Sequence, residues 1–405
     1  MYTNMWKRLF WSALLGLSIY FLINQQPLTS VHTAEVIPSI QPKMEIPAEL
    51  KLFANTYKKA IKAQFEEEQI PALAVCVLKD SLLLLKETWG VLDRDSLREA
   101  NNQSIFRIAS LSKGFAPILT GMLVEQGVLS WDDRVKQALP NFQLSDSAAT
   151  QDLNLKHLLS HTTGLPRHTF SNLLNMEVPY EDILKQLPEV EVAHPVGTYY
   201  NYQNVAYCLI GDVIEAKTGE TYDVQLNQLI FQKLGMTNAS TGYESFINTK
   251  NSTRPHKRIA AGFVRKELEN TFYDVIPAAG INASINDMEQ WLYLLLGNRP
   301  DLIQSATLDT IFEPRIRIST RERHFRAWKP LDRADYAMGW RVLQRDGHTI
   351  VWHSGYVNGF RAEMAFERES GYGIILLSNA TNQLVRNALP QFFDQVFKEE
   401  QKEKL

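Results

Sequence analysis

Strand-like segments lie at both ends of this chain, and this order constrains its fold more than any other feature of the sequence. Two apolar runs, 72–78 and 82–89, are separated by Lys79 and Asp80, a pattern typical of a β-hairpin at the edge of a sheet. Further strand patterns occupy the C-terminal part of the chain, at 336–344, 349–352, 360–366 and 373–377. One sheet assembled from both ends would account for all of them.

Helical patterns flank and separate these strands. Apolar residues recur at helical spacing within 48–69, and Pro71 then ends the pattern. Helices are also expected at 115–126 and 382–397, with more helices and loops in the long central region. Strands at both ends with helices between them indicate the α+β class, with a single sheet that draws on both termini.

The composition excludes several other classes of protein. The 405 residues are 45% hydrophobic and 21% charged, which is near the globular average and allows a large core. Two cysteines are too few for a disulfide scaffold or a four-cysteine zinc site. With 42 basic and 45 acidic residues, a net charge of -3, the chain has no global field that would attract nucleic acid.

The N-terminus has the pattern of a targeting segment. Lys7 and Arg8 precede an apolar run at 9–23, which has the length of a signal-peptide core and is shorter than a typical membrane span. We therefore expect residues 1–23 to be a signal peptide or a short membrane anchor, followed by an extended linker at 24–46. With the basic residues inside, the rest of the chain is expected to be exported, either periplasmic or anchored to the outer face of the inner membrane.

The first polar motif, Ser110-Leu111-Ser112-Lys113, stands just before the helix expected at 115–126. In a helical turn the side chains of Ser110 and Lys113 lie on one face. A serine hydroxyl is a weak nucleophile until a base removes its proton, and a neighbouring ammonium favours the alkoxide. A serine that caps a helix, beside a lysine that faces water, is the alternative interpretation.

The second motif, Tyr202-Gln203-Asn204, follows a tyrosine-rich stretch. A phenol whose pKa is lowered by a nearby lysine can transfer a proton between a nucleophile and a leaving group. An asparagine amide can both donate to and accept from a substrate amide. Because tyrosine is more often a packing residue, this motif alone would not identify a site.

The third motif, His353-Ser354-Gly355, is expected at the end of the strand 349–352. A glycine at a strand edge lets a substrate lie along the backbone as an additional strand. The backbone N–H of the next residue, Tyr356, could then donate to an oxyanion. The alternative interpretation of His353 is a hydrogen-bonded histidine within a strand.

The order Ser-x-x-Lys, Tyr-x-Asn and His-Ser-Gly resembles the penicillin-recognising serine hydrolases, in particular the class C β-lactamase-related branch with its DD-peptidases and esterases. Four other segments are similar to stretches of that branch: 106–109, 157–166, 234–237 and 336–340. The resemblance covers roughly residues 48–395. It implies a β-lactamase/transpeptidase-like fold: an antiparallel sheet built from N- and C-terminal strands and flanked by helices, with a mostly helical subdomain. We expect this domain at 47–398 and a charged tail at 399–405.

The resemblance also implies a role for each motif. Ser110 attacks the carbonyl, Lys113 and Tyr202 take its proton, and Tyr202 returns a proton to the leaving group. Asn204 orients the substrate amide, and the backbone N–H groups of Ser110 and Tyr356 form the oxyanion hole. The other expected substrate-binding residues are those of the third motif: His353, Ser354 and Gly355. No metal or organic cofactor is implied.

His353 departs from the efficient class C β-lactamases, which carry lysine at this place. Lysine is a permanent cation that attracts the carboxylate of a β-lactam, whereas histidine is mostly neutral at pH 7. We therefore expect an exported serine hydrolase of DD-peptidase or esterase type, which acts through an acyl-serine intermediate on a small amide, D-peptide or ester. A peptidoglycan-type substrate fits this expectation. A β-lactamase proper and a non-catalytic penicillin-binding sensor of the same fold are the alternatives.

Three further features have simpler interpretations. His157 and His161 have the helical spacing of zinc ligands but lack the intervening glutamate, so no metal is expected. Cys76 and Cys208 are expected to be buried free thiols, although export would permit a disulfide. The basic stretch 315–333 is expected to be a solvated loop, and no nucleic-acid partner is expected. The sequence leaves the oligomeric state open.

Overall fold

The computed structural model describes residues 45–403 of the chain. The targeting segment predicted at 1–23 and nearly all of the linker predicted at 24–46 lie outside the described residues and stay predictions. Within 45–403, no helix is long and apolar enough to cross a membrane. The elements below belong to one compact unit that begins at Ile46.

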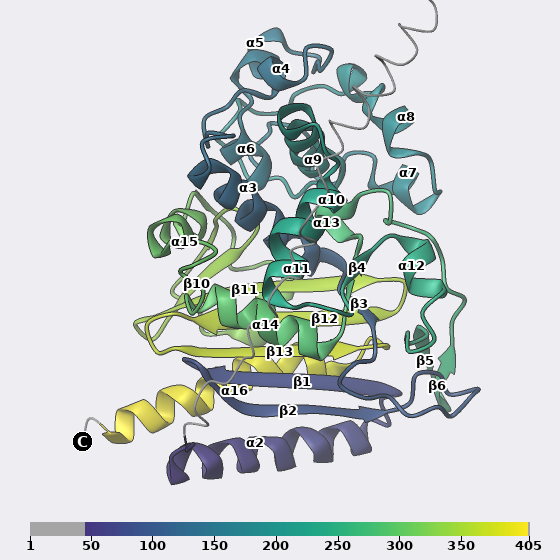
Figure 1. The fold of residues 1–405 in the computed structure, drawn as a ribbon, viewed down its shortest axis with the longest axis vertical. Helices are drawn as coiled ribbons and strands as arrows, with labels where there is room; N and C mark the ends of the chain where they lie inside the picture. The colour runs from purple at the N-terminus through teal and green to yellow at the C-terminus, as the bar shows by residue number, and fades with distance from the viewer. Residues whose placement is uncertain (1–44, 404–405) are drawn as a thin grey trace, which may run out of the picture. The chain divides into compact units, whose positions relative to one another are not determined.

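An eight-stranded antiparallel sheet forms the centre of this unit (Figure 1). Its strands, in spatial order, are β2 (Leu82–Gly90), β1 (Ala72–Lys79), β13 (Tyr372–Ser378), β12 (Phe360–Glu367), β11 (His348–Val357), β10 (Arg341–Arg345), β9 (Arg333–Tyr336) and β8 (Ile316–Arg317). β1 pairs with β13, Cys76 opposite Ile375, so the first and last described strands are neighbours. The predicted α+β fold and the edge position of the predicted hairpin are therefore confirmed.

Two predicted strands have different bounds in the structure. The single strand predicted at 336–344 is wrong, because β9 and β10 are separate strands joined by a tight turn at 337–340. Gly339 permits this turn with a φ of +76°, a conformation that other residues rarely adopt. The strand predicted at 349–352 is too short, because β11 pairs with β12 as far as Val357. The third motif therefore lies within a strand rather than at its end.

Helices cover both faces of the sheet (Figure 1). α2 (Ala48–Glu67) and α16 (Gln383–Glu403) pack on one face, and α14 (Ile285–Leu295) packs on the other. Side chains of β1 alternate between two cores: Val75 belongs to the core under α2 and α16, whereas Cys76 belongs to the core under α14. Both faces of this strand are buried, which explains why its sequence is almost continuously apolar.

A mostly helical region covers the α14 side of the sheet, as expected (Figure 1). Its longest helices are α3 (Phe115–Glu125), which continues the 3₁₀-helix η1 (Ala109–Gly114), and α9 (Val205–Thr218). Gly219 ends α9 in the left-handed conformation. The helices predicted at 48–69, 115–126 and 382–397 are confirmed as α2, α3 and α16.

Shorter elements complete the unit. The short helices are α4 (Val135–Ala138), α5 (Ser147–Asp152), α6 (Leu155–Leu159), α7 (Ser171–Asn175), α8 (Tyr180–Leu184), η2 (Leu187–Glu189), α10 (Tyr222–Leu226), η3 (Asn227–Phe231), α11 (Gln232–Leu234), α12 (Tyr243–Ile247), α13 (Ile276–Ala279), α15 (Ser305–Phe312) and η4 (Arg323–Trp328). A three-stranded sheet contains β3 (Phe106–Arg107), β7 (Ile281–Ala283) and β4 (Ser240–Thr241), and β5 (His256–Ile259) pairs with β6 (Gly262–Arg265).

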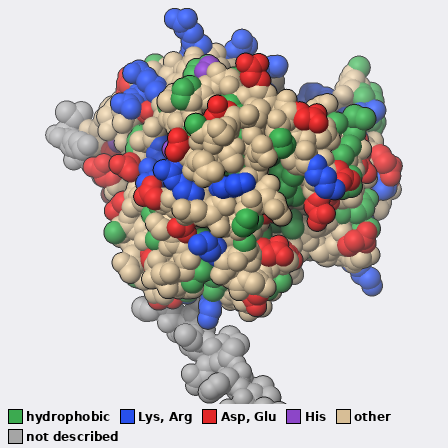
Figure 2. Space-filling view, turned by 90° about the horizontal axis from the view of Figure 1, so that it is seen from above, with side chains coloured by type: hydrophobic (Ala, Val, Ile, Leu, Met, Phe, Trp, Pro, Cys, Tyr) green, Lys and Arg blue, Asp and Glu red, His purple; other side chains and the backbone are tan. Residues whose placement is uncertain are grey.

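The basic stretch 315–333 is not the solvated loop that the sequence predicts. It contains β8 and η4, and the aromatic rings of Phe325 and Trp328 are buried in the core under α16. Arg315 and Arg333 form ion pairs with neighbouring carboxylates. On the face of the molecule shown in Figure 2, basic and acidic side chains are likewise interspersed.

Candidate active site

η1, which carries the first motif, lies against an open edge of β11. β10 pairs with β11 only up to Trp352, so residues 353–357 of β11 pair with β12 and leave their other edge free for η1. A Cβ at Gly355 would overlap the carbonyl oxygen of Ile108 and would lie 3.0 Å from the backbone nitrogen of Ser110. Gly355 is therefore what allows η1 to approach the strand this closely.

Ser110 is half-buried, and the backbone before it is strained. Ala109 has a φ of +50°, a left-handed conformation that costs a residue with a side chain about 1–2 kcal/mol. At the other end of η1, a Cβ at Gly114 would overlap the ring of Trp340. The strained turn is thus held by close packing against β11 on one side and against the β9–β10 turn on the other.

Lys113 connects the first motif with the second. Its side chain is fully buried, and its Nζ donates to Oδ1 of Asn204 at 2.8 Å and to the carbonyl of Ala278 at 3.0 Å. The same Nζ lies 4.6 Å from the centre of the Tyr202 ring. Because both acceptors are neutral, the positive charge of Lys113 stays available to neighbouring groups.

The second motif immediately precedes α9 and is fixed from several sides. Tyr202 is 8% exposed, and the Nδ2 of Asn204 donates to Oγ of Ser171 at 3.2 Å. The backbone N–H of Gln203 donates to Nδ1 of the buried His161 at 3.2 Å. The His161 ring packs 4.4 Å from the Tyr202 ring, centre to centre. These contacts hold the phenol beside the Lys113 ammonium.

His353 is buried and neutral. Its Nδ1 lies 3.0 Å from the carbonyl oxygen of Ser354, and its Nε2 lies 3.2 Å from the hydroxyl of Tyr336. Since a carbonyl can only accept, we assign the proton to Nδ1, and Nε2 then accepts from Tyr336. Burial, with the nearby charges of Arg341 and Lys113, holds the pKa of His353 well below its usual value. The imidazole therefore does not replace the positive charge of a lysine at this position.

Arg341 supplies a cation that the sequence analysis missed. It begins β10, is only 7% exposed, and its guanidinium lies 5.7 Å from the ring centres of both Tyr202 and Tyr336. Within the described residues, its Nε and Nη1 are buried and have no hydrogen-bond partner. Arginine stays protonated even when buried, and the Glu322 carboxylate acts on it electrostatically, but among the described residues no carboxylate forms an ion pair with it. The signal that could have identified Arg341 in the sequence is an arginine within a strand pattern that is otherwise mostly apolar.

The three motifs therefore meet at one place. Ser110 lies on η1 beside Gly355, Lys113 bonds to Asn204, and the ring centres of Tyr202 and His353 are 6.4 Å apart. Two residues of the third motif are more open: Ser354 is half-buried, and the side chain of Tyr356 is 60% exposed. This exposed end of β11 makes the cluster accessible from solvent.

The remaining sequence features lie apart from this cluster or serve it structurally. Cys76 in β1 and Cys208 in α9 are buried free thiols, as predicted. His157 accepts from the backbone N–H of Asn154 at the start of α6, so it is part of a helix cap. Among residues 45–403, no three His, Cys, Asp or Glu side chains are grouped closely enough to hold a metal ion.

Known proteins share both the sequence pattern and the fold. The sequence model of the Beta-lactamase family matches residues 57–391. Protein flp of Staphylococcus aureus strain N315 is 26% identical over 336 residues, which cover 81% of this chain and 63% of that protein. The Unguisins hydrolase ungD' of Aspergillus campestris is 23% identical over 80% of this chain and 61% of its own length. The chain thus spans about three fifths of the length of these curated relatives.

Two solved structures have the same fold. The octameric penicillin-binding protein homologue from Pyrococcus abyssi superposes with a TM-score of 0.72 at 20% identity, over 84% of this chain and 77% of that one. EstCE1, a hydrolase with promiscuous acyltransferase activity, superposes with a TM-score of 0.71 at 18% identity, over 85% of this chain and 100% of its own. Because the family pattern spans most of the sequence and the fold agrees with it, this chain belongs to the β-lactamase family.

Proposed function

We propose that this protein is an exported serine hydrolase that acts through an acyl-Ser110 intermediate on a small amide, D-peptide or ester. The observation that carries the proposal is the position of Lys113. Its buried ammonium bonds to Asn204 and lies 4.6 Å from the Tyr202 ring, and it stands on the same 3₁₀-helix as Ser110. A cation and a phenol that can relay a proton are therefore available beside Ser110, which borders the open strand edge.

Proton transfer would proceed between these three side chains. Ser110 Oγ attacks the substrate carbonyl, and the Lys113–Tyr202 pair accepts its proton: the Lys113 ammonium stabilises Tyr202 as a phenolate, and the phenolate oxygen takes the proton. Tyr202 then protonates the leaving group, the bond to the carbonyl carbon breaks, and Ser110 remains acylated. Water hydrolyses this ester in a second step, with the same pair as the base, and restores the serine.

The oxyanion would be stabilised by the backbone. The backbone nitrogen of Ser110 would lie 3.0 Å from a Cβ at Gly355, and Tyr356 is the next residue of the same strand, so we propose their two N–H groups as the donors. Two such donors stabilise the developing negative charge of the tetrahedral intermediate more than they stabilise the neutral carbonyl. An extended substrate could at the same time pair with the open edge of β11, which would align its carbonyl with Ser110.

The charges of the site favour a leaving group that carries a carboxylate. His353 is neutral, but Arg341 places a permanent cation 5.7 Å from the ring of Tyr202, the proposed proton donor to the leaving group. A free carboxylate at the C-terminus of a D-peptide could accept hydrogen bonds from the unpaired guanidinium nitrogens of Arg341. β-Lactams also carry a carboxylate, so β-lactamase activity is the second candidate function, favoured by the same residue.

Hydrolysis assays separate these possibilities. The purified protein should hydrolyse a chromogenic short-chain ester, and Ser110→Ala should abolish this activity at unchanged thermal stability. Full activity in Ser110→Ala would exclude Ser110 as the nucleophile. A panel of nitrocefin, acyl esters and D-Ala-D-Ala peptides then ranks the substrate classes. Turnover of nitrocefin at rates typical of resistance enzymes would overturn the preference for D-peptides and esters.

A non-catalytic penicillin sensor is the alternative from another functional class. Labelling with a fluorescent penicillin and with a fluorophosphonate distinguishes the two. Stable labelling by penicillin without turnover of any ester or D-peptide would favour the sensor. Lys113, Tyr202 and Asn204 would serve the acylation of Ser110 in both cases, because acylation already needs the proton transfer, so turnover is the property that separates an enzyme from a sensor.

Export is proposed from the sequence of residues 1–23 alone. N-terminal sequencing of the mature protein tests this. A mature terminus near residues 31–36 would indicate a cleaved signal peptide, whereas an intact terminus in the membrane fraction would indicate an anchor. An intact terminus in the cytosolic fraction would contradict export altogether.

A further inference from the structure

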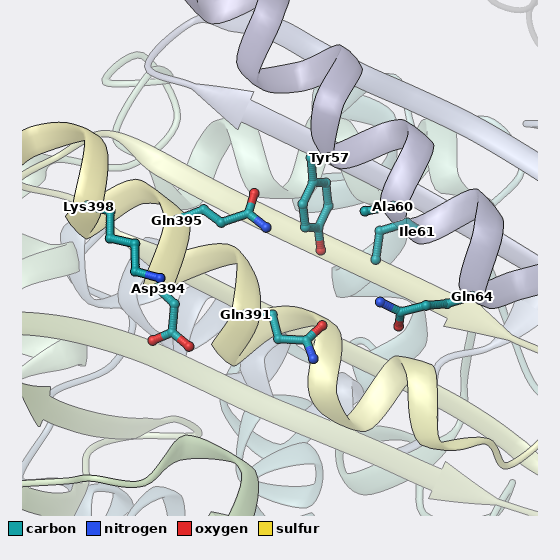
Figure 3. Close-up of a pocket in the computed structure, with 8 residues that line it drawn as sticks. All are labelled: Tyr57, Ala60, Ile61, Gln64, Gln391, Asp394, Gln395 and Lys398. Carbon is teal, nitrogen blue, oxygen red and sulfur yellow. The ribbon is translucent and has the colours of Figure 1, made fainter.

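A cavity of about 340 Å³ adjoins the open edge of β11 at the end that is farther from His353. Its walls include Asn175 of α7, Lys266, Glu269 and Phe272 of the loop before α13, and Tyr356 and Asn358 at the end of β11. A second hollow, between α2 and α16, lies on the opposite face of the sheet and cannot reach Ser110 (Figure 3). Only the first of these two is continuous with the proposed oxyanion hole, because Tyr356 belongs to both.

The loop that lines this cavity is held by β3, the short strand that precedes η1 and its Ser110. Arg107 of β3, shortly before Ser110, is fully buried and donates to the carbonyl oxygens of Glu269 at 3.0 Å and Thr271 at 2.6 Å. Its guanidinium also stacks 3.9 Å from the centre of the Tyr273 ring. These bonds hold the loop in place, including Phe272 with its unfavourable φ of +66°. The cavity is therefore a fixed feature beside Ser110.

Asn358 places an amide in the wall of the cavity. It forms the hairpin turn between β11 and β12 together with Gly359, and its φ of +48° is one that asparagine tolerates. The turn accounts for the backbone conformation of Asn358, but it does not account for the burial of its side chain, which is only 7% exposed. Neither its amide nitrogen nor its amide oxygen forms a hydrogen bond of good geometry within residues 45–403. A buried amide of this kind costs free energy unless a ligand satisfies it.

The charges beside Asn358 indicate a neutral ligand. Lys266 Nζ and Glu269 Oε1 are 2.8 Å apart, and their charges offset each other. The ammonium of Lys266, with a smaller contribution from a hydrogen-bonding contact of the Asn358 amide, holds the pKa of Glu269 below its usual value, so this carboxylate stays ionised at neutral pH. An amide that can offer one donor and one acceptor is matched best by another amide.

The open edge of β11 gives the orientation of the substrate. Tyr202, the proposed proton donor to the leaving group, lies at the His353 end of this edge. The acyl part must therefore extend the other way, past Tyr356 toward Asn358. Two residues of an extended strand cover about 6.6 Å. A substrate group near Asn358 would therefore lie about one peptide unit farther along the acyl chain than the substrate amide that Asn204 is expected to orient.

We infer that this cavity is an acyl-side subsite that binds a second amide of a peptide-like acyl group, through Asn358. The inference rests on the proposed function and restricts the class of acyl group that the enzyme would accept. The acyl donor is a peptide or an N-acylated dipeptide, and a simple aliphatic acyl group leaves the Asn358 amide unsatisfied.

Two chromogenic esters test the inference. The p-nitrophenyl esters of N-(acetylglycyl)glycine and N-pentanoylglycine have acyl chains of equal length and differ by one amide. The parent protein should hydrolyse the first with a kcat/KM at least about tenfold higher, which is the effect of one or two hydrogen bonds. Equal values for the two esters would overturn the inference but would leave the proposed function standing. Hydrolysis of neither ester would overturn both.

The variant Asn358→Gly keeps the turn, because glycine tolerates its φ, and removes the amide. It should lower kcat/KM for the acetylglycyl ester about tenfold more than for the pentanoyl ester. The matched control is Asp346→Gly, which changes the corresponding residue, with a φ of +52°, in the turn between β10 and β11. This control should keep the preference of the parent. An equal effect of Asn358→Gly on both esters would assign the residue to the turn alone.

Discussion

Two buried cations, Lys113 and Arg341, stand near the Tyr202 ring, at 4.6 and 5.7 Å from its centre. Both would stabilise a negatively charged phenolate during proton transfer. Their roles differ, because Lys113 bonds to Asn204, whereas two of the guanidinium nitrogens of Arg341 have no partner in the described part of the chain. Lys113 can thus serve the nucleophile while Arg341 remains free for the substrate.

Substitution of Arg341 should separate stability from activity. A buried charge without a partner costs free energy, so Arg341→Met should unfold within about 1 kcal/mol of the parent, or be more stable. The same variant should raise KM for a D-peptide with a free carboxylate at least about tenfold, with a smaller effect on a neutral ester. Denaturant titration and steady-state kinetics measure the two effects, and Arg341→Lys should restore part of the affinity. Equal losses on both substrates would contradict a role in carboxylate binding.

His353 should make the protein sensitive to acid. Burial holds its pKa well below 6.5 in the folded state, whereas in the unfolded chain it takes up a proton as the pH falls through about 6.5. The free energy of unfolding should therefore fall by up to about 1.4 kcal/mol per pH unit below that point, for each histidine buried in this way. His353→Gln should have a shallower slope in urea titrations between about pH 6.5 and pH 5. Parallel slopes would show that His353 is not buried as a neutral group.

Three short patterns predicted Ser110, Lys113, Tyr202 and Asn204 as parts of one site only through their resemblance to the penicillin-recognising serine hydrolases, and the structure places Lys113 beside Tyr202 and Asn204. The same patterns could not predict Arg341, because its significance comes from contacts with Tyr202 and Tyr336 that only the folded sheet creates. Nor could they predict that Tyr336 donates to His353.

At the scale of elements, the contact between η1 and β11 is what joins the motifs. It needs glycine at position 355, because a Cβ there would overlap Ile108 O. The bounds of most elements follow from apolar periodicity, as α2, α3 and β13 show. The 337–340 turn was missed because its apolar residues continue the strand pattern, and Gly339 alone breaks it.

Gly355→Ala should displace η1 from β11 and reduce activity more than stability. The added methyl should lower kcat by at least about a hundredfold through the position of Ser110, and should cost about 1–3 kcal/mol of unfolding free energy through overpacking. Gly121→Ala is the matched control, since its Cβ would press on the Thr307 side chain between α3 and α15, away from η1. If the two variants lose similar amounts of stability and only Gly121→Ala keeps its activity, the account is supported. Retained activity in Gly355→Ala would contradict it.

At the scale of the whole molecule, the site depends on a sheet assembled from both ends of the chain. β1 pairs with β13, and α16 covers the face opposite the site with buried side chains that include Leu389, Phe392 and Phe393. Strand patterns at both termini were enough to predict this architecture. The short helices between α3 and α9 were not predicted individually, because helices of so few residues carry little periodicity.

Truncations test the extent of the folding unit. Removal of residues 399–405 should leave the fold and the activity unchanged, because the described part of this segment, 399–403, is the polar last turn of α16. A chain that ends at Asn382 lacks α16 and loses several large buried side chains, each worth about 1.5–3 kcal/mol. This sum exceeds the roughly 5–15 kcal/mol by which domains are stable, so the shorter chain should not fold. Circular dichroism and ester hydrolysis measure both outcomes, and a folded chain ending at Asn382 would contradict the account.

The central claim is that one acyl group becomes attached to Ser110. Brief incubation with benzylpenicillin or with a p-nitrophenyl ester, acid quenching and intact-mass spectrometry measure this directly. The account predicts one added acyl group per chain, located by peptide mapping on the peptide that contains Ser110 and absent from Ser110→Ala. An adduct on another residue, or the same adduct in Ser110→Ala, would contradict it.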